Sequence, residues 1–232
     1  MVNTESICGV IERRTLHDEV VDRMRDMIIE GHLDADTRIN ETELCRHLGV
    51  SRTPVREAIK TLASEGLIIL VRNKGAVVRR LGTVEIYDMM ETVAVIERYA
   101  AEVGVERAGD DEISQIAALH NQMCALFNGG DRLAYYKHNQ AIHTALVALA
   151  HNKALSETHE SLQMKLRRMR YVGNEQRAAW SGAMREHEQI IRALKRRDSD
   201  ALRTAVEAHL SRTQSRLIAY LQTSRDEHAP PT

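Results

Sequence analysis

The sequence predicts a mainly α-helical protein in which an N-terminal winged helix-turn-helix precedes an all-α bundle of six helices. Aromatic residues make up 3% of the 232 residues, and glycine and proline are sparse, which favours helices over a β-sandwich or barrel. Apolar residues recur at helical spacing through most of the chain. Hydrophobic residues reach 43%, which is enough for a packed core in one large domain or two small ones.

Three helices are predicted in the N-terminal part of the chain. The first covers about 15–30, where apolar side chains recur every three or four positions. Asn40 begins the second, at about 40–48, and Glu43 stands three residues after it in the pattern of a capping box. The third covers about 52–65 and is followed by a glycine, which commonly terminates a helix.

A β-hairpin is predicted after the third helix. Residues 67–71 are rich in apolar and β-branched side chains, a turn with Gly75 follows, and 76–79 form a second short strand. The order of three helices and a hairpin is that of a winged helix. Arg72 and Lys74 lie at the tip of the wing, where they can reach phosphates or the minor groove of DNA.

The rest of the chain is predicted to be helical. Leu81 and Gly82 form a linker, and the expected domains are a DNA-binding domain at 10–80 and an effector, metal-binding and dimerisation domain at 83–224. Amphipathic helices of this number and length should pack as a bundle with an interior. The six helices are predicted at about 83–107, 110–128, 131–150, 152–171, 175–196 and 198–223.

Charge is distributed unevenly along the chain. The formal net charge is −1, so the whole chain carries no signature of nucleic-acid binding. From Arg38 to Arg80, however, nine basic side chains oppose four acidic ones, which gives a local charge of +5. A DNA phosphate responds to this local charge, so the winged region is the expected DNA-binding surface.

Cysteine content and hydropathy point to a cytoplasmic protein. The three cysteines, Cys8, Cys45 and Cys124, are scattered and odd in number, as expected for reduced thiols. The N-terminus is charged and lacks an apolar core of a signal peptide. No apolar run approaches the ~20 residues of a membrane span, so no membrane partner is expected.

The segment 49–58, with sequence GVSRTPVREA, carries the strongest functional signal. Ser51 and Thr53 can cap the free amides of a helix start, and proline is tolerated in a first helical turn. Arg52 and Arg56 are four residues apart and therefore share one helical face. Such a helix end suits phosphates and guanine edges. The alternative is an ordinary surface helix whose charges face solvent.

Residues 40–78, including LGVSRTPVREA and the later EGL, resemble the DNA-binding domain of the GntR family of bacterial transcription regulators. The resemblance implies that Gly75 lets the wing backbone approach DNA closely. One bidentate arginine–guanine pair contributes only ~1–3 kcal/mol of discrimination, so a homodimer on a palindromic operator is expected. The residues that the resemblance places on double-stranded DNA are Ser51, Arg52, Thr53 and Arg56, with Arg52 our choice for guanine recognition.

Four side chains of the helical half could form a divalent-metal site. Asn139 and His143 are four residues apart on one helix, whereas His187 and His209 stand in apolar stretches of the last two helices. Three inward histidines with one oxygen ligand suit a transition metal in a bundle. By spacing alone, each histidine can equally be a core or surface residue satisfied by hydrogen bonds.

The helical half resembles the FCD ligand-binding domain, and its six-helix length resembles the smaller VanR-like subgroup. The resemblance implies a metal held by Asn139, His143, His187 and His209, although Asn139 stands where aspartate is usual and contributes no charge. Zinc is expected first, with nickel or manganese as alternatives. A small organic acid would complete the coordination, and its second charged group would pair with Arg167 and Arg170.

The functional expectation is a ligand-responsive transcription regulator, a repressor by family resemblance. A metalloenzyme is the alternative from another class, but it needs a general base, and Glu186 and Glu188 are expected to point away from the face of His187. A further alternative is a regulator whose pocket binds its effector by hydrogen bonds without a metal.

Overall fold

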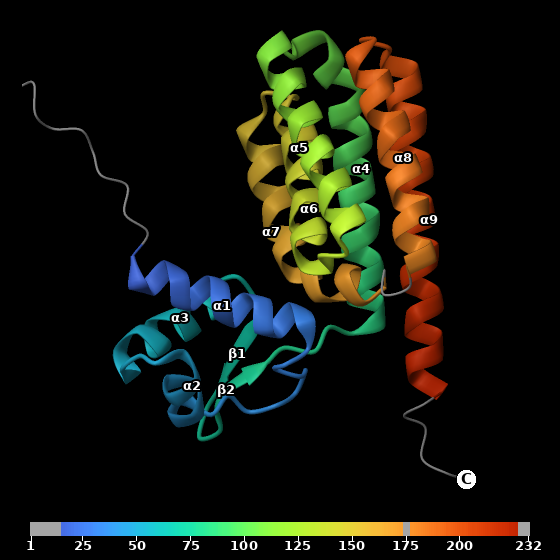
Figure 1. Ribbon diagram of the computed structural model, residues 1–232. Coiled ribbons are helices and arrows are strands. Elements are labelled where there is room, and N and C mark those ends of the chain that lie inside the picture. The colour runs from blue at the N-terminus through green and yellow to red at the C-terminus, as the bar shows by residue number, and fades with distance from the viewer. Residues whose placement is uncertain (1–14, 174–176, 227–232) are drawn as a thin grey trace, which may run out of the picture.

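The computed structural model describes residues 15–173 and 177–226 and has two parts. Figure 1 shows a small N-terminal domain below an upright bundle of long helices, with a short linker joining them. The N-terminal domain contains α1 (Leu16–Glu30), α2 (Glu41–Leu48), α3 (Arg52–Ser64), β1 (Ile68–Val71) and β2 (Gly75–Val78). The bundle contains α4 (Thr83–Arg107), α5 (Asp110–Gly129), α6 (Arg132–Ala148), α7 (Lys153–Val172), α8 (Arg177–Lys195) and α9 (Ser199–Asp226).

Local signals set most of the boundaries in the N-terminal domain. Thr15 and Asp18 form a reciprocal capping box at the start of α1. One of the two hydrogen bonds of the expected capping box is present, because the Asn40 side chain accepts from the backbone amide of Glu43. The Glu43 carboxylate accepts from the Asn40 side chain instead of from the Asn40 backbone. Gly49 ends α2 in the left-handed conformation that glycine tolerates best.

The start of α3 differs from the expected capping. Ser51 occupies the N-cap position, but its side chain makes no capping hydrogen bond within the described chain. The Thr53 side chain does not supply that hydrogen bond in its place. The helix is instead fixed by its buried face, from which Val55, Ala58 and Leu62 pack into the core of the domain. The hydroxyl groups at the helix start are therefore available to an external partner.

The wing is a two-stranded antiparallel hairpin with Ile68 opposite Val78 and Val71 opposite Gly75. An additional bridge joins Arg38, before α2, to Val77. Sequence reasoning missed this bridge because a single extended residue has no periodicity. It ties the loop after α1 to the wing and so fixes both against the helices.

The bundle has a continuous apolar core contributed by helices far apart in the sequence. Ile116 of α5, Ile142 of α6, Ile190 of α8 and Leu202 of α9 are all nearly inaccessible to solvent. The six predicted helices are confirmed, with described ends that differ by a few residues; the predicted start of the fifth, at 175, lies outside the described residues. Among the described helices, none is both long and apolar enough to cross a membrane.

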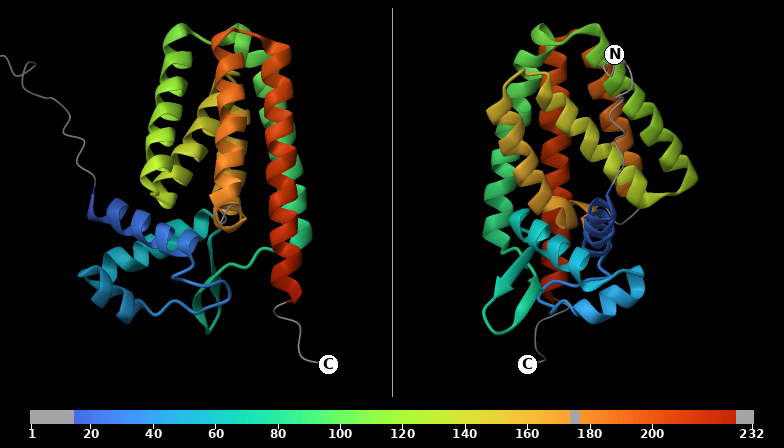
Figure 2. Two further views of the ribbon diagram at one scale, coloured as in Figure 1. Left: turned by 45° about the vertical axis from the view of Figure 1, so that its right-hand side comes forward. Right: turned by 90° about the vertical axis from the view of Figure 1, so that its left-hand side faces the viewer.

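The two domains meet where α1 lies against the lower end of α6 and α7, as the views in Figure 2 agree. Lys137 of α6 forms an ion pair with Asp26 of α1 at 2.6 Å. Arg168 of α7 donates to the backbone carbonyl of Ile28 at 2.7 Å and to the carboxylate of Asp34 at 3.1 Å. A charged guanidinium on two oxygens fixes the orientation of α1 more tightly than apolar contact alone.

Apolar and aromatic side chains complete this interface. Ile29 of α1 is buried against Tyr136 of α6 and Tyr171 of α7. The two tyrosine rings meet edge to face with centroids 5.5 Å apart. The Tyr136 hydroxyl donates to the backbone carbonyl of Arg167 at 2.9 Å. The contact between the domains is thus built on residues of the bundle interior.

Candidate DNA-binding surface and candidate metal centre

The first turn of α3 presents its polar side chains to solvent. Ser51, Arg52, Thr53 and Arg56 are all exposed, whereas Val55 between them is fully buried. This alternation follows from helical geometry, because one face packs on α1 and the other is left free. The four residues predicted from sequence thus lie together on one accessible surface.

The wing extends this surface. Arg72, Lys74 and Gly75 are exposed at the tip, and a groove between the wing and α3 is lined by both elements. Gly75 has a φ of +80°, a conformation that other residues rarely adopt. The backbone conformation therefore favours glycine at this position.

Arg56 has a partner within the protein. Its Nε donates to the carboxylate of Glu41, at the start of α2, over 2.8 Å. The hydrogen bond and the charge of Glu41 raise the pKa of Arg56 above its ordinary value. Because the pair is exposed, water and phosphate compete with Glu41 for the guanidinium, and Arg56 stays accessible from outside the protein.

The bundle interior contains a cluster of three histidines. His143 of α6, His187 of α8 and His209 of α9 offer ring nitrogens that all lie within 4.8 Å of one another, and their side chains are almost completely buried. The ring of His187 stands at 88° to both others, while His143 and His209 are nearly parallel. The three predicted histidines are therefore brought together from separate helices.

Two buried carboxylates determine how two of these rings are protonated. Nδ1 of His143 lies 2.7 Å from Glu97, and Nδ1 of His209 lies 2.8 Å from Glu186. Burial opposes ionisation of both acids, but their partners outweigh it: the pKa of Glu97 falls well below its usual range and that of Glu186 to about 2. An ionised carboxylate only accepts hydrogen bonds, so both Nδ1 atoms carry the proton.

The consequence is two lone pairs directed at each other. Burial lowers the pKa of His143 to about 4, against the opposing effect of Glu97, and also lowers that of His209, so both rings are neutral. Their Nε2 atoms face one another at 3.2 Å. Two acceptors cannot satisfy each other, whereas two ligands about 2.1 Å from a metal at ordinary coordination angles stand about 3.0–3.4 Å apart.

His187 provides the clearest sign of a missing partner. The residue is fully buried, yet neither ring nitrogen has a hydrogen-bond partner among the described residues. Burial lowers its pKa well below the ordinary value, so the ring is a neutral ligand. Leaving a buried polar group unpaired costs roughly 1–3 kcal/mol, and a metal ion removes that cost for the one nitrogen that it binds. The donor set of three neutral imidazoles therefore fits a divalent transition metal.

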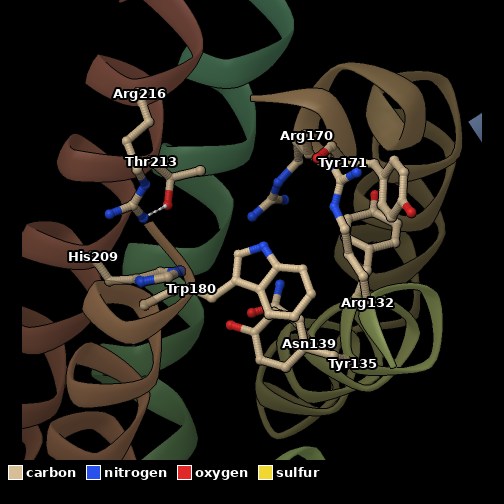
Figure 3. A pocket seen from close by; sticks show the side chains of 11 residues that line it. Arg132, Tyr135, Asn139, Arg170, Tyr171, Trp180, His209, Thr213 and Arg216 are labelled. Carbon is tan, nitrogen blue, oxygen red and sulfur yellow. Dashed lines mark hydrogen bonds between the residues drawn. The ribbon is translucent and has the colours of Figure 1, made fainter. Parts of the chain in front are cut away.

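A pocket opens beside this cluster, as Figure 3 shows. His209 of α9 and Asn139 of α6 both line it, and Trp180 lies near its centre, stacked on Tyr135 with ring centroids 5.3 Å apart. Arginines approach from opposite sides of the pocket. The three that line it are Arg132, Arg170 and Arg216.

The pocket is rich in donors that lack acceptors. The Tyr135 hydroxyl and the Nε atoms of Arg132 and Arg216 are buried without a hydrogen-bond partner among the described residues. Burial raises the pKa of Tyr135, so its hydroxyl stays protonated. Buried donors with no acceptor indicate a ligand that supplies oxygens, and cationic arginines favour an anionic one.

Comparison with known proteins assigns the chain to a family. "Bacterial regulatory proteins, gntR family" matches residues 16–78 and "FCD domain" matches residues 88–212. The Nta operon transcriptional regulator of Aminobacter aminovorans is 30% identical over 201 residues, covering 84% of this chain and 91% of that protein. The chain belongs to the GntR family and carries an FCD domain.

Other relatives agree with this assignment. The HTH-type transcriptional repressor RspR of Escherichia coli K12 is 25% identical over 204 residues, 88% of this GntR regulator and 89% of the repressor. The solved structure of E. coli McbR/YncC superposes with a TM-score of 0.76 at 19% identity, covering 90% of this chain and all of the other, and so shares the fold. The relatives are transcription regulators, so this protein is a DNA-binding transcription regulator rather than an enzyme.

Two expectations about the effector side of this GntR regulator need correction. Arg170 lines the pocket, but Arg167, predicted beside it, is not among the residues that line it. Glu186 was expected to point away from the site because it neighbours His187. It instead contacts His209 of the adjacent helix, since a residue facing away from one partner can face another.

Several residues of the site escaped sequence reasoning. Glu97 stands in the middle of α4 with no motif around it, and Arg132 and Arg216 are single arginines in amphipathic helices. The only available signal for Glu97 was its position: the apolar spacing of this helix places it on the buried face, where a charged residue is unusual. The arginines had none, because their partners are distant in sequence.

Proposed function

We propose that this regulator is a repressor that binds a palindromic operator as a homodimer and responds to a metal ion and a small carboxylate effector. The relative RspR is named as a repressor, which supports repression rather than activation. The main support for a ligand response is the state of His187. This residue is fully buried, neither of its ring nitrogens has a hydrogen-bond partner among the described residues, and it lies beside two other neutral histidines.

On the DNA side, Arg52 is proposed to recognise a guanine, while Ser51, Thr53, Arg56 and the wing residue Lys74 hold phosphates or base edges. The uncapped hydroxyl groups at the start of α3 and the exposure of both arginines support this assignment. Because one helix supplies limited discrimination, two copies reading two half-sites are required, and this makes the homodimer part of the proposal. Binding of chromosomal DNA implies action in the cytoplasm.

On the ligand side, His143, His187 and His209 are proposed to hold the metal, with Asn139, which lines the same pocket as His209, as a neutral oxygen ligand. Zinc is our first choice among metals that accept imidazole ligands. The bound metal would supply a Lewis-acidic position for one carboxylate of the effector. Arg170, with Arg132 and Arg216, would pair with the remaining negative charge.

The coupling between the two sides is proposed to pass through α7 and the neighbouring face of α6. Tyr136 and Tyr171 line the pocket and also pack against Ile29 of α1. A ligand that moves either ring changes the surface on which α1 rests. Such a ligand shifts the population of domain orientations, and with it the separation of the two recognition helices in the dimer.

Metal analysis of protein purified without chelator tests the ligand-binding part of this proposal. We expect about one divalent transition metal per chain by elemental mass spectrometry and a dimer by native mass spectrometry. His143→Ala should lose the metal and keep the dimer, because the residue is buried within one chain. Wild-type protein that stays metal-free even after incubation with zinc, nickel or manganese would contradict the metal centre.

A further inference from the structure

The carboxylate of Glu97 contacts more than a single histidine. Glu97 lies on α4 and is 3% exposed. One oxygen accepts from Nδ1 of His143 at 2.7 Å. The other accepts from His159 at 2.9 Å and from the side-chain amide of Gln163 at 3.2 Å. Three donors from two other helices therefore meet on one buried acid.

The network continues from Glu97 into the pocket. The amide oxygen of Gln163 accepts from the guanidinium of Arg170 at 2.5 Å. Gln163 and Arg170 are seven residues, or two turns, apart on α7, so they lie on one face of that helix. An uninterrupted chain of buried hydrogen bonds thus runs from His143 through Glu97 and Gln163 to Arg170.

We propose that Glu97 is a positioning residue shared by the two ligand sites, orienting His143 toward the metal and, through Gln163, setting the place of Arg170 in the acid-binding pocket. The inference rests on the metal and acid sites proposed above and adds the residues that join them. Carboxylates behind ligating histidines fix the ring and raise its basicity. Here the same acid also supports an anion-binding arginine through Gln163, so one substitution at Glu97 should weaken both sites.

The second carboxylate of the site, Glu186, also connects a histidine to an arginine, and it does so by direct contacts. Glu186 accepts from Nδ1 of His209 at 2.8 Å and lies 3.3 Å from a nitrogen of Arg216, which lines the pocket. Each acid therefore pairs one histidine of the cluster with one arginine of the pocket. The repetition on separate helices indicates that coupling is a property of the site rather than an accident at Glu97.

Glu97→Gln tests the proposal because it keeps the shape of the side chain and removes its charge. Nickel affinity should fall about 10–100-fold, measured by competition with a chromophoric chelator. Affinity of the nickel-saturated variant for acetate, malonate or citrate, measured by calorimetry, should also fall, by about tenfold, because the hydrogen bond that holds Gln163 beside Arg170 is weakened. Glu91→Gln, an exposed position on the same helix, should change neither affinity.

Gln163→Met provides the second test and does not depend on the folding of the first variant. It should weaken acid binding about tenfold while weakening nickel binding less than Glu97→Gln does. A Glu97→Gln protein with weakened nickel binding but unchanged acid affinity would overturn the shared role and leave both sites standing. Wild-type protein that binds none of the three acids would overturn the pocket itself and this inference with it.

Discussion

The recognition surface and the histidine centre place opposite demands on the chain. Arg52 and its neighbours at the start of α3 are exposed and come from one short segment. His143, His187 and His209 are buried and come from three helices, and a fourth helix contributes Glu97. The exposed surface leaves its side chains ready for a partner that brings its own phosphates and bases. The buried centre depends instead on helix packing to bring its rings together.

The comparison predicts different responses to substitution. A change in the recognition surface removes one contact among many with DNA, and water replaces it. A change in the histidine centre leaves other buried groups unpaired, which makes its effect larger. The expected effects below run from the largest to the smallest.

Removal of a ring from the cluster should have the largest effect. His187→Ala removes a ligand outright, so zinc affinity should fall by more than about 100-fold, beyond the range for residues behind the ligands. Calorimetric titration measures the change, and circular dichroism checks that the bundle is intact. His151→Ala, which removes an exposed histidine paired with Glu112, is the control and should bind zinc normally. Equal affinity in both variants would refute the assignment.

Metal should stabilise the bundle by mass action. At a free zinc concentration 100 times the dissociation constant, the gain is about 2.7 kcal/mol, which should appear as a rise in the unfolding temperature of the bundle. Differential scanning calorimetry measures this rise, and excess chelator should reverse it. No rise is expected for His187→Ala. A similar rise in that variant would show that zinc binds elsewhere.

Arg52→Ala should weaken operator binding by about 1–3 kcal/mol, the worth of one bidentate contact with guanine. Binding to unrelated DNA should change less, because phosphate contacts from other side chains remain. Fluorescence anisotropy with both DNAs measures the difference. Arg192→Ala, an exposed arginine of α8, is the matched control. An equal loss on both DNAs would reassign Arg52 from base recognition to phosphate contact.

Glu41→Gln should have the smallest effect and the opposite sign. The substitution removes the internal partner of Arg56, so operator affinity should rise, by less than about fivefold because the pair is exposed. The same anisotropy titration at low salt detects it. A decrease in affinity would show that Glu41 holds Arg56 in its DNA-binding position, and that the pair contributes to recognition.

The helices and hairpin that carry the proposed recognition surface could be predicted almost fully from the sequence because their determinants are local. Capping residues, helical spacing and glycine positions indicated α2, α3 and the wing within one or two residues. The Ser51 cap was wrong in detail, since buried apolar contacts hold the helix without it. The bridge from Arg38 to Val77 could not be predicted, because single-residue pairings leave no pattern.

The histidine centre could be predicted only in part. Spacing along one helix joined Asn139 to His143, but nothing in the sequence places Glu97 beside His143, 46 residues away. Long-range pairing depends on how helices pack, and a helix surface offers several faces at similar spacing. This is why Arg167 was expected in the pocket and Arg216 was not. The sequence indicated the three histidines that come together in the bundle, and only the packing revealed the carboxylates and arginines around them.

The central claim is that occupation of the bundle pocket changes how the protein holds DNA. Operator affinity, measured by fluorescence anisotropy on a palindrome selected from a random pool, tests it most directly. Zinc with citrate should change the affinity of the wild-type protein at least about fivefold, the lower range for coupled sites, and leave His187→Ala unchanged. Equal operator affinity of the wild-type protein with both sites saturated and with both empty would contradict the account.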